Sequence, residues 1–447
     1  MSAPPQIDPR KLRITDMRFA DIIDAPKRCT LMKLMTNQGI TGYGEIRDAA
    51  SKTYALMLKS RIIGENPCDV NRLFRKIKQF GGHSRQGGGV SGIEIALWDI
   101  VGKTYQVPLY QLLGGKYRDK VRVYCDTDVQ GNNTGLEMGK ALKKRMEMGF
   151  TFLKMDLGIG LLLGREGMLT APLGMLDEMQ AYAPHILNAQ GGSVTSDMVK
   201  HQKSYALATT AHPFTVIHIT EKGLDYLEAY MKDVRSVIGY DIPLAIDHFG
   251  HVSVEDGIRF ARRMEKYNLA WIEDMIPWMY TDQYRRLKDA TTIPVCTGED
   301  IYLSDNFEPL VKGHAVSIVH PDILTCGGAA ELKKIGDMAD DQGIGVAIHM
   351  AESPVACLAA VHVAAALHNV MALEFHSVNV PWWKDMVVGL DDPFIKDGYI
   401  TVPEKPGLGI EGFNDAVLQE HLNPDIPGLW EPTDAWNREF SNDRLWS

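Results

Sequence analysis

The sequence has few cysteines and no closely spaced pair of them. Six cysteines are scattered over 447 residues, and none forms a CxxC motif. This distribution argues against a zinc cluster and against a disulfide framework, both of which need several cysteines at short, regular intervals. We therefore expect the thiols to be reduced and mostly buried.

Clustered positive charge and long apolar stretches are also missing. The formal net charge is −10, which argues against a nucleic-acid partner because phosphate neutralisation needs clustered Lys and Arg. No uninterrupted apolar segment is long enough to cross a bilayer, and the first residues lack the basic patch and apolar run of a targeting segment. These absences predict a cytoplasmic protein with no membrane partner.

The length suits a large barrel and one further unit. Residues 11–45 alternate in the manner of strands and residues 52–103 have helical periodicity, so we expect an α+β domain over 1–118. In residues 119–385, eight strand-like runs alternate with helical stretches, which predicts a TIM-like barrel of α/β class. The last segment, 386–447, is expected to return to the first domain.

One stretch does not fit a minimal barrel. Residues 157–218 are rich in Gly, Met, Thr, Ser and Ala, and the stretch is far longer than a usual connection between a strand and a helix. Met, Leu and aromatic residues recur throughout it. We therefore expect an insertion that forms a partly ordered lid or an oligomer contact, with a simple linker as the alternative.

Three carboxylates follow apolar, strand-like runs at equal intervals. Asp247, Glu273 and Glu299 are spaced 26 residues apart, which suits one strand, one helix and two loops. Each acid would then lie at the carboxyl end of one of three successive parallel strands. Hard divalent cations, above all Mg²⁺, take such oxygen ligands and keep positions open for substrate. The alternative is three solvated surface acids.

These features together resemble the enolase superfamily. The resemblance rests on the α+β lead-in, the helix with Ala96–Asp99, the glycine pair Gly114–Gly115 and the three spaced acids. Within the superfamily the chain is similar to the mandelate racemase subgroup, especially its acid-sugar dehydratases of the galactonate and mannonate kind. The resemblance covers nearly the whole chain outside 157–218. It implies a capping domain over a modified (β/α)7β barrel, one Mg²⁺ held by the three acids, and a homo-oligomer.

Asp322 and His349 are the candidate proton-transfer pair. They follow the sixth and seventh strand-like runs, so neighbouring strands would bring them within hydrogen-bond reach. A carboxylate beside an imidazole fixes its tautomer and raises its pKa, which suits a base working near neutral pH. The pair matches the subgroup's His–Asp dyad. The alternative is a structural histidine.

Two further strand ends carry candidates. Glu374 follows the eighth run, where an acid in the family donates a hydrogen bond to the substrate carboxylate; a structural ion pair is the alternative. Lys154 would neutralise the substrate carboxylate or act structurally. Racemizing members usually have Lys-x-Lys here, and Asp156 at the second of these positions makes a two-base racemase doubtful. Asp156 then becomes a candidate substrate contact.

The residues after the third strand depart from the family pattern. Galactonate dehydratase-like members have a catalytic His two residues after the metal-binding Asp, where this chain has Phe249. Regular strand alternation would point His248 away from the barrel, whereas a turn at Gly250 would bring His251 inward. Both histidines are candidates for substrate binding or proton transfer, and the second acid/base is unassigned.

A glycine-rich loop in the first domain adds two candidates for substrate binding. His83 and Arg85 lie within residues 80–89, where related enzymes contact the distal end of the substrate. Arginine pairs well with carboxylates and hydroxyls. A solvated loop charge is the alternative.

The sequence therefore predicts a Mg²⁺-dependent hydro-lyase whose partner is a small hydroxy-carboxylate. It would convert an aldonate or aldarate to a 2-keto-3-deoxy acid through an enolate, with His349 abstracting the α-proton or protonating the departing hydroxyl. The alternatives are a racemase, epimerase or cycloisomerase that uses the same enolate, and a non-catalytic protein of this fold. A metal-dependent hydrolase is disfavoured because residues 121–126 contain no His-x-His.

Overall fold

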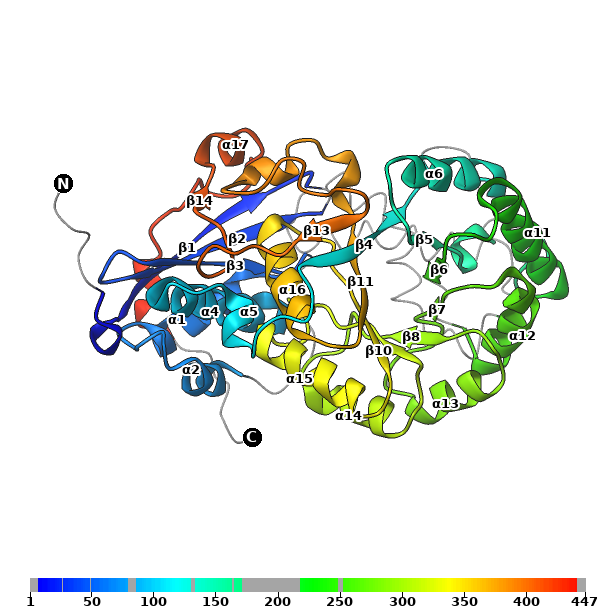
Figure 1. Ribbon diagram of the computed structural model, residues 1–447, viewed down its shortest axis with the longest axis horizontal. Coiled ribbons are helices and arrows are strands. Elements are labelled where there is room, and N and C mark those ends of the chain that lie inside the picture. Colours follow the sequence, from blue (N-terminus) through cyan, green and yellow to red (C-terminus); the bar gives the residue numbers. More distant parts are fainter. Residues whose placement is uncertain are drawn as a thin grey trace. The chain divides into compact units, whose positions relative to one another are not determined.

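The computed structural model (Figure 1) describes most of the chain. The described residues are 7–25, 27–48, 50–78, 86–129, 133–162, 165–170, 218–247 and 252–439. Two compact units are present. The first unit comprises Met1–Val123, Glu299–Glu308 and His320–Ser447, and the second comprises Tyr124–Gly298 and Pro309–Val319.

The first unit begins with an antiparallel three-stranded sheet, which confirms the strands expected over residues 11–45. Its strands follow in the order β1 (Ile14–Ile22), β2 (Cys29–Thr36) and β3 (Thr41–Ile46). Helices α1 (Lys52–Ile62), α2 (Val70–Ile77) and α4 (Ser91–Tyr105) follow it in the chain (Figure 1).

The helix α4 packs directly on the backbone of β3. A Cβ added at Gly42 would lie 2.2 Å from the Ala96 carbonyl oxygen, and one at Gly44 would lie 2.2 Å from that of Gly92. Only glycine therefore permits this approach. The alternating glycines of β3 are explained by the packing of α4.

The first unit also contains the last strands of the barrel and the C-terminal segment. Its further elements are α5 (Leu109–Leu112), α15 (Ala329–Asp340), β10 (Gly345–Ile348), α16 (Pro354–Ala366), β11 (Val370–Phe375), β12 (Val387–Val388), β13 (Tyr399–Thr401), β14 (Gly412–Phe413) and α17 (Asp415–Glu420). The C-terminal segment contacts the first sheet: the Asn423 amide donates to the Asp21 carbonyl (2.8 Å) and the Trp430 amide to the Phe19 carbonyl (3.1 Å).

The second unit consists of short parallel strands with helices outside them (Figure 1). Its strands are β5 (Leu153–Asp156), β6 (Leu244–Asp247), β7 (Ile272–Glu273), β8 (Val295–Thr297) and β9 (Ile318–Val319), each parallel to the next. Its helices are α6 (Gly135–Glu147), α11 (Glu221–Ile238), α12 (Val254–Met264) and α13 (Thr281–Asp289).

The strand order is that of a (β/α)7β barrel, which confirms the predicted fold class. Strands β4 (Lys120–Thr127) to β11 follow one another in chain order in one sheet, and β11 also pairs with β4. A helix follows each of the first seven strands; between β8 and β9 it is α14 (Ser304–Lys312). Antiparallel β13 pairs with the start of β4.

Most of the predicted insertion lies outside the described residues. Of 157–218, the structure describes 157–162, 165–170 and 218. The described residues on either side of 171–217 are in contact, because the Thr170 amide donates a hydrogen bond to the His218 carbonyl (3.0 Å). The role of the insertion as a lid or oligomer contact stays a prediction, as do the domain boundaries at 1–118, 119–385 and 386–447.

The burial of the cysteines agrees with the expectation from composition, and the helices add a separate finding. All six cysteines are free, and all but Cys68 are buried. In the part of the chain that the structure describes, no helix combines the length and apolarity needed to cross a bilayer.

Two buried glutamates of the capping region bind the first residues of barrel helices. Glu45 accepts hydrogen bonds from the Ser353 hydroxyl (2.5 Å) and amide (3.1 Å) at the start of α16. Glu94 accepts from the amides of Ala329 (2.7 Å) and Ala330 (3.0 Å) at the start of α15. Burial raises the pKa of each carboxyl to about 7, although these hydrogen bonds oppose the shift.

We expect Glu45 to make stability pH-dependent. Because its folded pKa of about 7 exceeds the usual 4.5, the native state binds more protons between these values, and stability falls as pH rises through that window. Over this pH window, the titration of Glu45 would reduce the free energy of unfolding by up to about 3 kcal/mol. In urea unfolding at pH 4.5 to 8, Glu45→Gln should therefore lose less stability than the wild type as pH rises.

The exposed Glu147 provides the control, since Glu147→Gln should follow the wild-type pH profile. Parallel profiles for wild type and Glu45→Gln would show that the hydrogen bonds at the start of α16 keep the Glu45 carboxyl ionised throughout.

Candidate active site

The second unit brings Lys154 together with two of the predicted metal ligands. Lys154 lies on β5, and Asp247 and Glu273 end β6 and β7, as the sequence predicted for the two acids. The Lys154 Nζ lies 2.7 Å from Asp247 Oδ2 and 3.0 Å from Glu273 Oε1, and all three residues are buried. Trp271 Nε1 donates to the other Glu273 oxygen (2.7 Å).

These acids offer a donor set that fits a hard divalent cation. One carboxylate oxygen each from Asp247, Glu273 and the adjacent Asp274 lie within 4.8 Å of one another. Buried carboxylates need a positive partner, and in this cluster Lys154 supplies one positive charge. An all-oxygen set of this kind suits Mg²⁺. Asp274 is held by a hydrogen bond from the Thr297 hydroxyl (2.5 Å).

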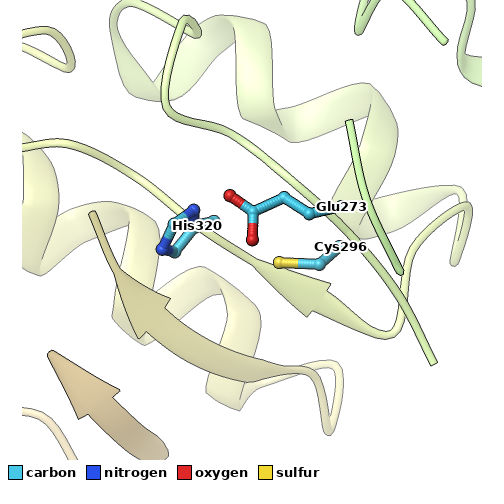
Figure 2. A group of neighbouring side chains, drawn as sticks. All are labelled: Glu273, Cys296 and His320. Atoms are coloured by element: carbon cyan, nitrogen blue, oxygen red, sulfur yellow. The ribbon is translucent and has the colours of Figure 1, made fainter. Parts of the chain in front are cut away.

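A thiol lies beside Glu273. Figure 2 shows Glu273 and Cys296, which come from the neighbouring strands β7 and β8. Burial, followed by the charge of Glu273, raises the pKa of the Cys296 thiol well above its usual value. Cys296 is therefore a neutral thiol here, not a thiolate ligand. His320, the third residue drawn, directly follows β9 and belongs to the first unit.

In the first unit, His349 and Asp322 form the pair that their positions predicted. His349 Nδ1 lies 2.7 Å from Asp322 Oδ2, and Asp322 is fully buried. The other oxygen of Asp322 accepts from the amides of Leu324 (2.7 Å) and Thr325 (2.9 Å). Burial raises the pKa of Asp322, whereas Arg47 and these two amides lower it. In the tautomer that carries its proton on Nδ1, His349 donates a hydrogen bond to an ionised Asp322 and has the lone pair on Nε2.

Arg47 supplies positive charge to this cluster, and no pattern in the sequence pointed to its role. It directly follows β3, is 7% exposed, and its Nη1 pairs with Asp322 Oδ2. The same nitrogen lies 3.3 Å from Glu352 Oε1 and 3.1 Å from His349 Nδ1. Two buried carboxylates therefore share one guanidinium.

Glu374 lies among imidazoles at the end of β11. It is fully buried, and its oxygens lie 3.5 Å from His320 Nε2, 3.3 Å from His376 Nε2 and 3.8 Å from His349 Nε2. The same His349 nitrogen lies 3.3 Å from Glu299 Oε2. The structure thus groups Glu374 and Glu299 with the histidine of the predicted dyad.

Comparison with known protein families shows the family to which the chain belongs. Residues 137–416 match the enolase C-terminal domain-like family, and residues 11–114 match the N-terminal domain of mandelate racemase and muconate lactonizing enzyme. The chain belongs to the enolase superfamily. The family resemblance drawn from the sequence is thereby confirmed.

Two curated relatives match over most of their length. The D-xylonate dehydratase of Haloferax volcanii is 31% identical over 91% of this chain and 89% of its own. The D-galactonate dehydratase of Pectobacterium atrosepticum is 26% identical over 90% and 93%. Both names designate acid-sugar dehydratases, the branch of the superfamily that the sequence resembled.

Solved structures of this superfamily have the same fold. A mandelate racemase/muconate lactonizing enzyme-like protein from Rubrobacter xylanophilus has a TM-score of 0.75 and 28% identity, covering 93% of this chain and 99% of that one. An enolase superfamily member from Salmonella Typhimurium has a TM-score of 0.73 and 25% identity, covering 92% and 98%.

Several predicted site residues cannot be placed beside these clusters. His83, Arg85, His248 and His251 lie outside the described residues, and their roles stay predictions. By contrast, Asp156 is placed: it ends β5, is exposed, and is the register partner of Asp247 on β6.

The sequence interpretation missed five charged or imidazole residues of the two clusters: Arg47, Asp274, His320, Glu352 and His376. Asp274 could have been noticed because it adjoins Glu273, and His376 because it follows Glu374 by two residues. Arg47 and Glu352 carry no comparable local signal.

Proposed function

We propose that this protein is a Mg²⁺-dependent dehydratase that converts an aldonate to a 2-keto-3-deoxy acid. The observation that carries the proposal is the 2.7 Å contact between His349 Nδ1 and Asp322 Oδ2, which prepares Nε2 to take a proton. Dehydratases are carbon–oxygen lyases, the enzyme class predicted from the sequence. Of the two predicted substrate classes we favour aldonates, because D-xylonate and D-galactonate are aldonates.

His349 acts in this proposal as the base. Its Nε2 takes the proton from C2 of the substrate, and the electron pair of that C–H bond forms an enolate with the carboxylate. Asp322 stabilises the imidazolium that results. The C3 hydroxyl then takes a proton, either the one held by the His349 imidazolium or one from a second acid, and leaves as water. The electron pair of the enolate forms the C2–C3 double bond, and the resulting enol becomes the 2-keto acid when its hydroxyl proton is lost and C3 gains a proton.

By the family resemblance, Asp247, Glu273 and Glu299 would hold the Mg²⁺. Asp247 and Glu273 belong to the set of acids that also includes Asp274, whereas Glu299 lies beside His349 Nε2. The bound cation would supply charge stabilisation to the enolate, which is otherwise inaccessible near neutral pH. Lys154, buried against Asp247 and Glu273, would add positive charge near the substrate carboxylate. Glu374 would hydrogen-bond to that carboxylate. The cytoplasmic location and the homo-oligomer stay predictions.

A panel of aldonates and aldarates tests the proposal. With Mg²⁺ present, we expect a 2-keto-3-deoxy product from at least one aldonate, and we expect chelation by EDTA to stop its formation. In deuterated water, substrate recovered before completion reports whether its α-proton exchanges. Exchange with an altered configuration and no keto product would instead indicate a racemase or epimerase. Absence of both Mg²⁺ binding and exchange would contradict an enzyme of either kind.

A further inference from the structure

We propose that His349, Glu374 and His376 form a second metal site, which binds a transition-metal cation such as Zn²⁺. One ligand atom of each residue lies within 4.8 Å of the other two. This set shares no residue with the three acids proposed to hold Mg²⁺, although one of them, Glu299, lies close by, with its Oε2 3.3 Å from His349 Nε2. The Mg²⁺ site that the family resemblance implies is made of carboxylate oxygens, so it does not by itself imply a site with imidazole ligands.

The distances approach those of a zinc centre. Tetrahedral zinc with bonds of about 2.0–2.2 Å separates its ligand atoms by roughly 3.4 Å. His376 Nε2 lies 3.3 Å from Glu374 Oε1, and His349 Nε2 lies 3.8 Å from the other oxygen, Oε2. When one atom is taken from each residue, the three atoms lie within 4.8 Å of one another. Modest side-chain rotations would therefore close the three ligands on one ion.

Asp322 gives His349 the second-shell partner that metal-binding histidines usually have. A ligating imidazole commonly donates its other N–H to a carboxylate, which fixes its tautomer and raises its basicity. Here Asp322 Oδ2 lies 2.7 Å from His349 Nδ1. The lone pair of Nε2 is thereby directed to the side of Glu374.

The donor chemistry selects the class of metal. Two imidazoles and one carboxylate are the ligands of several catalytic zinc sites, whereas Mg²⁺ prefers oxygen ligands. Glu374 is fully buried, and nitrogens of His320, His349 and His376 lie within 3.8 Å of its oxygens. Binding of a metal would release any proton that the Glu374 carboxyl carries, because only the carboxylate acts as a ligand. The side chain of His376 is 17% exposed, which gives the site an edge reachable from solvent.

Occupation of this site should inhibit the enzyme. This consequence rests on the proposed function, because a metal bound to His349 Nε2 would take the lone pair needed for proton abstraction. The binding itself does not depend on that function. Zinc would thus act as an inhibitor even when Mg²⁺ is in excess.

The test is a titration of the full-length protein in excess Mg²⁺. Calorimetry should show one Zn²⁺ bound per chain, and visible absorption should show Co²⁺ in a site with imidazole ligands. His376→Gln should weaken Zn²⁺ binding by at least about 100-fold, and Asp322→Asn by about 10–100-fold. His368→Gln is the matched control, because His368 is an exposed histidine of the same unit, and it should bind Zn²⁺ as the wild type does.

Two results would overturn the site. One is equal affinity for Zn²⁺ in wild type and His376→Gln, with loss of binding in Asp247→Asn, since zinc would then use the Mg²⁺ ligands. The other is no Zn²⁺ binding in excess Mg²⁺.

The variants need controls for folding and for activity. Circular dichroism shows whether each variant is folded, and His376→Asn is used in place of His376→Gln if His376→Gln does not fold. Inhibition by Zn²⁺ is expressed for each variant as its turnover rate with zinc relative to its own turnover rate without zinc. If no aldonate reacts, the binding results still decide the site.

Discussion

Replacing His349 with Asn should abolish dehydration while leaving the fold intact. General acid–base catalysis contributes about 10²–10⁴-fold to rate, and Asn cannot take the α-proton. We therefore expect kcat on the best aldonate to fall by at least that factor. Exchange of the substrate α-proton in deuterated water should be lost in parallel, because the same nitrogen performs both steps.

Two further variants sharpen this test. Asp322→Asn should also reduce kcat strongly, because an amide can hold the imidazole in the wrong tautomer. His368→Asn changes an exposed histidine of the same unit and should leave kcat at the wild-type value. A His349→Asn variant that keeps its fold and its turnover would remove His349 from the mechanism and, with it, the dyad.

The fold could be predicted from the sequence because its signals repeat along the chain. The 26-residue spacing of Asp247, Glu273 and Glu299 marks successive strand–helix units. In the structure Asp247 and Glu273 end β6 and β7, and Glu299 follows β8 by two residues. The periodic pattern of apolar residues and the short connections between elements are local properties of the sequence. Strands and helices can therefore be predicted from them without knowledge of the tertiary contacts.

The candidate site was predictable only where its residues follow strands. Asp322 and His349 were found because neighbouring strand ends must meet. Arg47 was not, because its contact with His349 spans 302 residues and joins a loop after β3 to the end of a barrel strand. No periodic pattern encodes such a pairing, and a polar residue after a strand is common on protein surfaces.

Arg47 should therefore affect both stability and turnover. Arg47→Met would leave Asp322 and Glu352 buried without the guanidinium that they share. Removing one partner of a buried ion pair costs about 3–5 kcal/mol, because an uncompensated charge remains. We expect a loss of this size in the free energy of unfolding by urea at pH 7. Misplacement of Asp322 should also reduce kcat by about 10–100-fold.

A second substitution distinguishes charge balance from simple packing. Burial and the charge of Asp322 raise the pKa of Glu352 well above its usual value, whereas Arg47 lowers it. If Glu352 is ionised beside Arg47, adding Glu352→Gln to Arg47→Met should restore part of the stability, because one buried acid is then neutral. Restoration of kcat should be smaller, since Asp322 still lacks its guanidinium. Arg47→Lys keeps the charge and should fall between wild type and Arg47→Met in both measurements. An additive double variant would mean that Arg47 acts through its packing alone and that the shared-charge explanation is wrong.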